Sequence, residues 1–197
     1  MHVLRWIGSL LLAAGLLGGA VPALAKEGAP PAGMSLRFGS TDYVHRWSQK
    51  GQNEFTPPAQ PDLAKWRDMV TLNVHDNVGN ADQLANLANG VLGNYQRHGR
   101  ILRTDSRPRT PQRPAEHLIV AILAAPGVAE AVFARVVLVE GKGVVVVYSH
   151  RAYGKDAAAS IGSWLQSKGQ SVETTLMAWQ AMPKLAQLRA LPQARGK

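Results

Sequence analysis

The chain has 197 residues, with 22 Lys and Arg against 13 Asp and Glu, a formal net charge of +9 and no Cys. The lack of Cys excludes disulfide bonds, thiol catalysis, thiolate metal sites and attachment of a lipid to an N-terminal Cys. The excess of positive charge favours anionic partners such as acidic proteins, anionic lipids, envelope polymers or nucleic acid.

The first 25 residues have the three-part layout of a secretory signal peptide. A short basic start containing Arg5 precedes an uncharged apolar run over 6–21, and Ala23 and Ala25 provide an Ala-x-Ala cleavage site. The apolar run is shorter than the ~20 residues that a membrane-spanning helix needs. We therefore expect a signal peptide over 1–25 and export to a bacterial periplasm, with an uncleaved N-terminal anchor as the alternative. Export makes nucleic acid a poor candidate partner.

After the signal peptide, the sequence predicts one compact domain with irregular ends. Residues 26–41 begin with a stretch rich in Gly, Pro and Ala and are predicted to form a flexible leader. Residues 42–183 carry periodic apolar patterns and are numerous enough for a hydrophobic core without cross-links. Residues 184–197 contain helix-breaking and basic residues, so we expect a basic tail that frays.

The domain is predicted to begin with strands. Residues 42–48 form the first candidate, and the following 49–62 are predicted as a polar loop because they contain three Pro. In 69–75, apolar and polar residues alternate with the period of a half-buried strand. The polar side chains of this strand share one face: Thr71, Asn73 and His75.

An amphipathic helix is predicted over 81–98, where apolar residues recur at helical spacing. Asn80 or Asp82 could cap its N-terminus, and the Gly after its last residue is a typical stop. Gly90 and Gly93 weaken the prediction, because each costs about 1 kcal/mol relative to Ala. They could instead allow the helix to lie close to a sheet.

Four more strands are predicted in the second half of the chain: 101–105, 116–124, 130–139 and 143–150. The turn at 140–143 contains two Gly and joins the last two as an antiparallel hairpin. Val144 to Val147 are all apolar, which is typical of a strand that is covered on both faces.

Two helices are predicted to follow, one over 156–168 that ends at Gly169 and one over 171–182 that stops at Pro183. Strands paired mostly by hairpins and followed by helices indicate an α+β fold. We expect one compact domain with a mainly antiparallel sheet and helices packed on it. The sequence does not indicate an oligomeric state.

No catalytic motif is present: the sequence lacks a G-x-S-x-G elbow, a His-Glu-x-x-His pair, a phosphate-binding loop and a dinucleotide fingerprint. Ser149 and His150 are neighbours on a predicted strand and so point to opposite faces. The chain is therefore predicted to be a non-enzyme without a cofactor. A hydrolase whose triad is assembled from distant segments is the alternative.

Three histidines lie at or near the ends of predicted strands: His75, His117 and His150. Neutral imidazoles that converge at a sheet edge can bind zinc or copper. The alternative is that each is an isolated strand-end histidine, since their spacing is not that of a metal motif.

A second candidate site is an anion- or ligand-binding surface made of four side chains: Arg135, His150, Arg151 and Tyr153. Arg135 interrupts an apolar strand, where an unpaired charge would be costly. The alternative is that Arg135 faces an edge or pairs internally with Glu116 or Glu130.

The third candidate is the basic stretch 97–113, which holds six Arg and one Asp. Arg107, Arg109 and Arg113 lie in its Pro-rich part. Arg side chains suit carboxylates and phosphates because the guanidinium group donates two parallel hydrogen bonds. Binding to an acidic protein or to anionic lipid is the functional interpretation, and a solvated loop is the alternative.

The order of elements resembles that of the small exported Mog1/PsbP-like domains of bacteria. The residues that suggest it are Trp66-Arg-Asp-Met-Val-Thr-Leu-Asn-Val, the helix with Leu84-Ala-Asn-Leu-Ala-Asn, and Ile101–Thr104. The resemblance covers 42–182 and lies in the topology. It implies a non-enzymatic binding or accessory role and carries over no site residues. Many such domains are lipoproteins, whereas this chain lacks the Cys.

The leading expectation is an exported periplasmic binding or accessory protein that acts through a protein–protein surface, for example as the immunity protein of an envelope-targeted toxin. Its partner would be a protein or an anionic envelope component, with peripheral membrane contact as a further alternative and no nucleic acid. The competing expectation is a periplasmic protein that binds a metal or a small ligand through the strand-end histidines.

Overall fold

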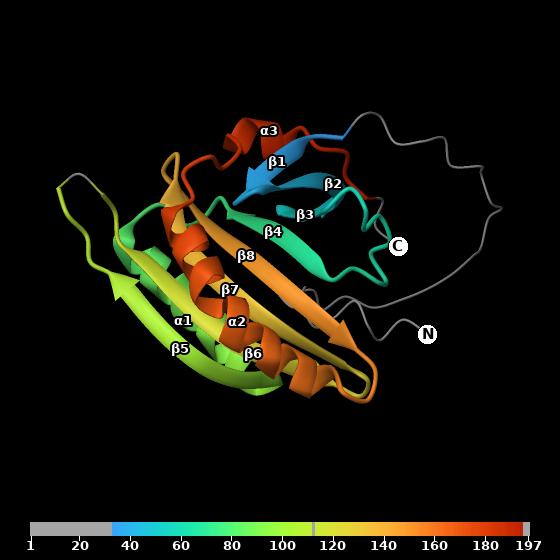
Figure 1. The fold of residues 1–197 in the computed structure, drawn as a ribbon. Helices are drawn as coiled ribbons and strands as arrows, with labels where there is room; N and C mark the ends of the chain where they lie inside the picture. Colours follow the sequence, from blue (N-terminus) through green and yellow to red (C-terminus); the bar gives the residue numbers. More distant parts are fainter. Residues whose placement is uncertain (1–32, 112, 195–197) are drawn as a thin grey trace, which may run out of the picture.

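The computed structural model describes residues 33–111 and 113–194 (Figure 1). The predicted signal peptide over 1–25 and the first part of the predicted leader lie outside the described residues. The helices and strands are β1 Ser35–Phe38, β2 Thr41–Gln49, β3 Gln52–Thr56, β4 Asp68–His75, α1 Ala81–His98, β5 Gly99–Arg107, β6 Glu116–Ala125, β7 Val128–Val139, β8 Lys142–Tyr153, α2 Ala157–Ala178 and α3 Leu185–Arg189.

The described strands form one antiparallel sheet in the order β1-β2-β3-β4-β8-β7-β6-β5. Strands β1 to β4 make one meander and β5 to β8 another, and the two meet where β4 pairs with β8. Helix α1, which connects the two meanders in the sequence, crosses one face of the sheet. Helix α2, which follows β8, lies on the opposite face (Figure 1). The fold class predicted from the sequence, α+β with a mainly antiparallel sheet in one domain, is confirmed.

Strand β8 shows why the sheet is covered on both faces. Val144 and Val146 belong to the core on the α2 side, whereas Val145 and Val147 belong to the core on the α1 side. Successive side chains of a strand point to opposite faces, so a continuous Val run fits a position between two helical layers. Each fully buried Val contributes roughly 1.5–3 kcal/mol. The predicted hairpin between β7 and β8 is also confirmed.

Two strands lie where the sequence predicted irregular chain. β1 starts at Ser35, inside the predicted leader 26–41, and its Leu36 and Phe38 are buried in the α2-side core. β3 lies inside the predicted polar loop, and its Phe55 is fully buried. Both strands are short and polar, and their few apolar side chains are fixed by pairing with β2 rather than by a local pattern.

The end of the described chain also packs on the core. Leu185, Leu188 and Leu191 are buried against the α2 side of the sheet, and the backbone N–H of Ala194 donates to Ser48 O at 2.7 Å. The tail predicted over 184–197 is therefore ordered as far as it is described. Its three Leu have helical spacing, and the sheet supplies the apolar surface that they cover.

Helix α1 has the predicted bounds, and the Asn80 side chain caps it by accepting a hydrogen bond from the backbone N–H of Gln83 at 2.9 Å. The suggestion that Gly90 and Gly93 allow close approach to the sheet is wrong. A Cβ atom on Gly90 would meet nothing within 4 Å, and one on Gly93 would meet only the Arg97 side chain.

Helix α2 is continuous where two helices were predicted, because Gly169 does not end it. Gly169 is buried instead, and a Cβ atom there would lie 3.8 Å from Phe133. The residue marks the packing of α2 against the sheet and not a chain reversal. Among the described residues, no helix has the length and apolar character needed to cross a membrane.

Candidate functional site

The three histidines proposed as metal ligands lie in different parts of the sheet. His75 pairs with Gly143 at one end of the β4–β8 ladder, and His150 pairs with Asp68 at the other end. At about 3.3 Å per residue, these ends are roughly 23 Å apart. His117 lies on β6, where its Nδ1 is 2.9 Å from Ser106 Oγ. The described residues contain no cluster of three or more His, Asp or Glu that could hold a metal ion, so this site is not assembled.

Arg135 is a structural residue inside the protein. Its side chain is only 2% exposed and its Nε donates to Glu116 Oε2 at 2.9 Å. Its Nη1 donates to the backbone oxygens of Leu176 and Trp179 at 3.0 and 2.8 Å, which satisfies carbonyl groups at the C-terminus of α2. The internal pair with Glu116, one of the alternatives considered above, is therefore the arrangement found.

Arg151 is buried on the other face of the sheet. Its Nε and Nη2 donate to Glu130 Oε2 at 2.9 and 2.6 Å, and its guanidinium lies 3.9 Å from the centre of the Trp66 ring. Tyr153 donates to the backbone oxygen of Trp66 at 2.8 Å. These contacts hold the segment before β4 against the end of β8. The predicted ligand surface does not form, because both arginines are buried in internal ion pairs on opposite faces of the sheet. His150 lies on the face of Arg135 and not on that of Arg151.

His150 belongs to a polar cluster that the sequence analysis did not find. Asp68 Oδ1 accepts hydrogen bonds from His150 Nδ1 and from the Tyr148 hydroxyl, both at 2.8 Å, and Oδ2 accepts from Gln60 Nε2 at 3.1 Å. The Trp164 ring stacks on His150, with 4.2 Å between ring centres. Asp68 shares the apolar face of β4 with Val70 and Leu72, and this phase was the signal for a half-buried carboxylate.

The electrostatics of this cluster keep Asp68 ionised. Burial alone would raise the pKa of Asp68, but the hydrogen bonds from His150, Gln60 and Tyr148 together hold this pKa below its ordinary value. An ionised carboxylate only accepts, so the proton on the bonded nitrogen belongs to the His150 ring. Burial, with Asp68 nearby, raises the pKa of Tyr148, which therefore stays protonated as a donor. The cluster fixes the orientation of the imidazole.

Two Ser–His contacts occur in the described structure, and neither has the features of a catalytic triad. Ser48 Oγ is 2.7 Å from His45 Nε2, but Ser48 is fully buried and donates to Asn53 Oδ1 at 2.7 Å. The contact between Ser106 and His117 is exposed. No carboxylate among the described residues bonds the ring of His45 or His117, whereas a triad needs one to orient its base.

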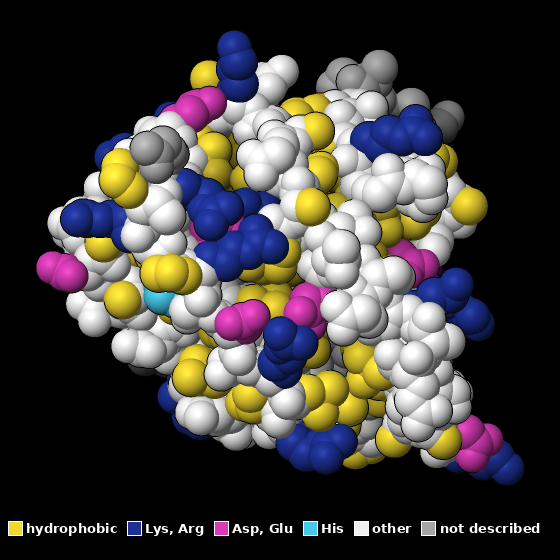
Figure 2. Space-filling model, turned by 60° about the vertical axis from the view of Figure 1, so that its left-hand side comes forward, with side chains coloured by type: hydrophobic (Ala, Val, Ile, Leu, Met, Phe, Trp, Pro, Cys, Tyr) yellow, Lys and Arg dark blue, Asp and Glu magenta, His cyan; other side chains and the backbone are white. Residues whose placement is uncertain are grey.

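The sheet edge formed by β5 is polar and largely exposed. Seven of its nine residues are exposed, and Leu102, beside a bulge in the β5–β6 pairing, is 39% exposed. Five arginines lie on this strand and the loop that follows it, and we call them the arginine edge: Arg100, Arg103, Arg107, Arg109 and Arg113. Figure 2, in which this side comes forward, shows Lys and Arg side chains gathered near the middle of the face, next to acidic ones.

Two of these arginines already have partners. Arg103 lies 3.2 Å from Asp105 and 3.3 Å from Glu173 of α2. Arg107 donates to the backbone oxygen of Met177 at 2.8 Å, with the buried Glu116 carboxylate 3.9 Å away. These contacts fix the β5 edge to the C-terminal half of α2.

The other three arginines carry the unneutralised charge. Arg100, Arg109 and Arg113 are exposed, and no ion pair joins them to a carboxylate in the described part of the chain. Arg109 and Arg113 line the same open hollow, in a loop closed by backbone hydrogen bonds between Thr110 and Arg113. Of the sites predicted from the sequence, this basic segment is the one whose charged groups remain accessible to a partner.

The opposite edge of the sheet differs in both length and cover. β1 has four residues, and the Trp179 indole N–H donates to the backbone oxygen of Arg37 at 2.9 Å. That carbonyl is therefore not available to an incoming strand. Of the two described edges, β5 is the one that offers a long row of exposed backbone groups.

No protein-family model and no curated protein matches the chain. Among solved structures, the Ran-binding protein Mog1p of Saccharomyces cerevisiae is similar, with a TM-score of 0.44 and 10% identity over 70% of this chain and 84% of that chain. PA94 of Pseudomonas aeruginosa, a protein of unknown function, has a TM-score of 0.43 and 11% identity over 78% of this chain and 100% of that chain. Both are consistent with the weak Mog1/PsbP-like resemblance in topology, and they assign no site.

Proposed function

We propose that this chain is an exported, non-enzymatic binding protein that acts on an acidic protein partner through the arginine edge. The observation that carries the proposal is the group of three exposed arginines without ion pairs, Arg100, Arg109 and Arg113, beside an exposed edge strand. Exposed charges without internal partners keep their full attraction for an opposite charge, whereas those in existing pairs are partly neutralised.

The signal-peptide layout of residues 1–25 supports export. In the envelope, the available anionic partners are acidic proteins, lipid head groups and polymers. Backbone groups along β5 and the apolar side chain of Leu102 favour a protein among these, because lipid head groups offer no strand to pair with. Neutralising an envelope-targeted toxin is one concrete form of this role.

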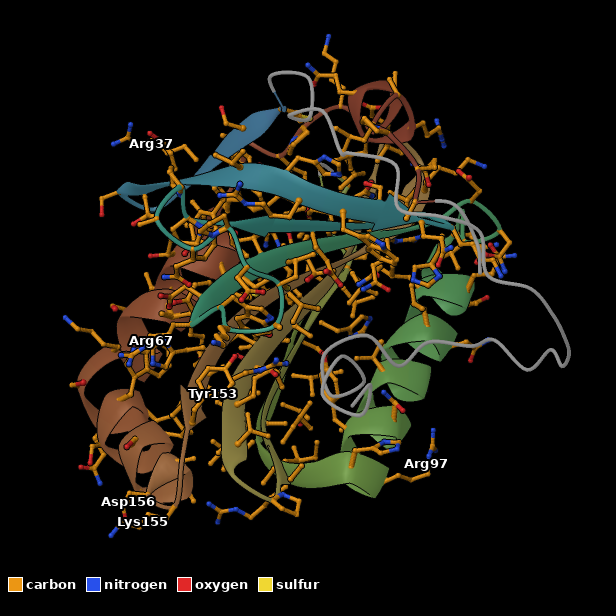
Figure 3. All side chains as sticks on the ribbon, turned by 90° about the vertical axis from the view of Figure 1, so that its right-hand side faces the viewer. Arg37, Arg67, Arg97, Tyr153, Lys155 and Asp156 are labelled. Carbon is orange, nitrogen blue, oxygen red and sulfur yellow. The ribbon has the colours of Figure 1, made fainter. Side chains whose placement is uncertain are left out.

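Photo-crosslinking in cells tests the binding surface. A photoreactive amino acid replaces Leu102 or Arg109 in the full chain, and a control replaces Lys155, which lies at the N-terminal end of α2 (Figure 3). The C-terminal end of the same helix contacts Arg107, so Lys155 lies about 30 Å from that arginine. We expect one discrete protein adduct from the β5 positions and none from Lys155. Equal labelling at all positions, or adducts with lipid only, would contradict the proposal.

Charge reversal gives a matched comparison. Arg109→Glu with Arg113→Glu should remove most of the adduct, whereas Arg67→Glu with Lys155→Glu changes the net charge equally and should retain it. Export is tested separately by the mass of the protein from the periplasmic fraction. A chain beginning at Lys26 is expected, and protein found only in the cytosol with residues 1–25 intact would refute export.

A further inference from the structure

We infer that the partner contributes an extended acidic segment, which pairs with β5 as an additional strand of the sheet. This inference specifies how the arginine edge binds and rests on the function proposed above. An edge strand presents unpaired N–H and C=O groups on its outer side, and extended peptides commonly bind by adding a strand to such an edge. β5 has nine residues, long enough for an incoming strand of ordinary length.

The register of β5 places its basic side chains on one face. Arg100, Arg103 and Arg107 pair with Ile122, Val120 and Glu116 of β6, respectively. Ile122 and Val120 contact the core on the α2 side, so these arginines lie on the α2 side of the sheet. Side chains directly opposite each other on paired strands are about 4.5–5.5 Å apart. An incoming strand with acidic residues at alternate positions would therefore place one carboxylate opposite Arg100, which has no ion pair. Its other carboxylates would lie beside Arg103 and Arg107, which already contact α2.

Asp105 shows the chemistry that this edge accepts. Its Oδ2 lies 3.2 Å from Arg103 Nη2, and its Oδ1 accepts a hydrogen bond from the backbone N–H of Ser106 at 2.8 Å. One carboxylate thus neutralises an arginine and satisfies a backbone donor of the edge strand, as an acidic side chain from a partner would. Asp105 is exposed and lies on the same face as the arginines, so it competes with an acidic partner.

The charge also selects against a second copy of this chain. If two β5 strands paired, the arginines of each would approach those of the other, and like charges on opposing strands are destabilising. An acidic strand meets no such repulsion, so the edge is protected from self-association while remaining open to a partner of opposite charge.

The test uses the full chain as purified and a synthetic peptide about as long as β5, in which Glu alternates with Val and Thr. A peptide with Lys in place of Glu is the charge control, and phosphatidylglycerol vesicles are the lipid probe. We expect binding of the Glu peptide alone at low salt. Arg100→Glu combined with Arg109→Glu and Arg113→Glu should weaken it about tenfold or more, from lost and reversed charge pairs. Asp105→Ala should tighten it about threefold, a gain that misfolding cannot imitate.

Amide hydrogen exchange followed by NMR reports the binding mode. Strand addition should slow exchange at alternate β5 amides by at least tenfold, while the amides of β1 at the other edge stay unchanged. If the Glu peptide binds without slowing any β5 amide, the strand pairing is refuted and the proposed function stands on side-chain contacts. If neither peptide binds, or both bind equally, the inference is refuted, and the crosslinking experiment alone decides the proposed function. Binding to vesicles only would overturn both.

Discussion

Replacement of Arg135 by Met is the sharpest test of the buried ion pair. Met keeps much of the side-chain length but removes the charge and the donors, and it leaves the Glu116 carboxylate, 4% exposed, without its nearest cation. Removing one partner of a buried pair costs about 3–5 kcal/mol, because the remaining charge is not compensated. The backbone oxygens of Leu176 and Trp179 also lose their donor, which places the cost toward the upper end of that range.

Urea unfolding followed by circular dichroism measures this cost. Thermal unfolding gives a second measure. For a chain of this size, 1 kcal/mol corresponds to about 2–4 °C in Tm, so Arg135→Met should lower Tm by roughly 6–20 °C. Arg107, whose guanidinium lies 3.9 Å from Glu116, is the group that could lessen the loss. The double variant Arg135→Met with Arg107→Met should therefore lose more unfolding free energy than the sum of the losses in the two single variants.

A second double variant separates the pair from its surroundings. Arg135→Met with Glu116→Leu removes both charges, and replacing both partners of a buried pair by apolar groups is often close to neutral. We expect it to recover more than half of the loss caused by Arg135→Met. A cost below about 1 kcal/mol for the single variant, or a double variant no more stable than the single one, would refute the assignment of Arg135 as a buried structural residue.

Three further changes test other parts of the fold. The pKa of Asp68 in the folded protein is held below the ordinary 3.8, so Asp68 contributes stability above that pH and loses this contribution as the pH falls through the lowered pKa. Asp68→Asn should therefore cost about 1–3 kcal/mol at pH 7. It should also flatten the acid side of a plot of the urea midpoint against pH. Gly143→Ala should cost about 1–3 kcal/mol in urea unfolding, because its Cβ would lie 2.6 Å from Val78 Cγ1; a neutral result would contradict this packing. Gly169→Ala should stabilise by about 0.5–1 kcal/mol in thermal unfolding, since the new Cβ makes ordinary contacts inside a continuous helix, whereas a helix end there would make it destabilising.

The elements predicted well from the sequence were those whose patterns are local and long. The alternation in β4, the capped apolar stripe of α1 and the hairpin of β7 and β8 were all recognisable in the sequence. β1 and β3 were not, because they are short and polar and are fixed by pairing with neighbouring strands, β1 with β2 and β3 with β2 and β4. The burial of Gly169 within a continuous α2, with Phe133 nearby on the sheet, is likewise a tertiary contact that no local pattern reports.

The candidate site was harder to predict, although part of its logic is visible in strand phase. Arg135 shares its face with Phe133 and Val137, and both belong to the core on the α2 side. This phase indicates a buried arginine, and Glu116 was one of the two internal partners considered. What the sequence could not supply is the position of α2, whose C-terminal carbonyls complete the hydrogen bonding of Arg135. The alternation of residues along a strand predicts the face of the sheet on which a side chain lies. Its hydrogen-bond partners on other helices and strands depend on tertiary packing.

The buried ion pairs and the arginine edge differ in how their charges are neutralised. Arg135 with Glu116 and Arg151 with Glu130 are nearly neutral units, one on each face of the sheet, and each removes a carboxylate from the surface. Because each pair buries one arginine together with one carboxylate, the pairs leave the net charge of the surface unchanged, and the unpaired Arg100, Arg109 and Arg113 keep their charge. A partner that binds at β5 meets a field that its own carboxylates must neutralise. Its affinity should accordingly fall with ionic strength, because exposed charges are screened beyond about 8 Å at physiological salt, while the buried pairs keep their strength.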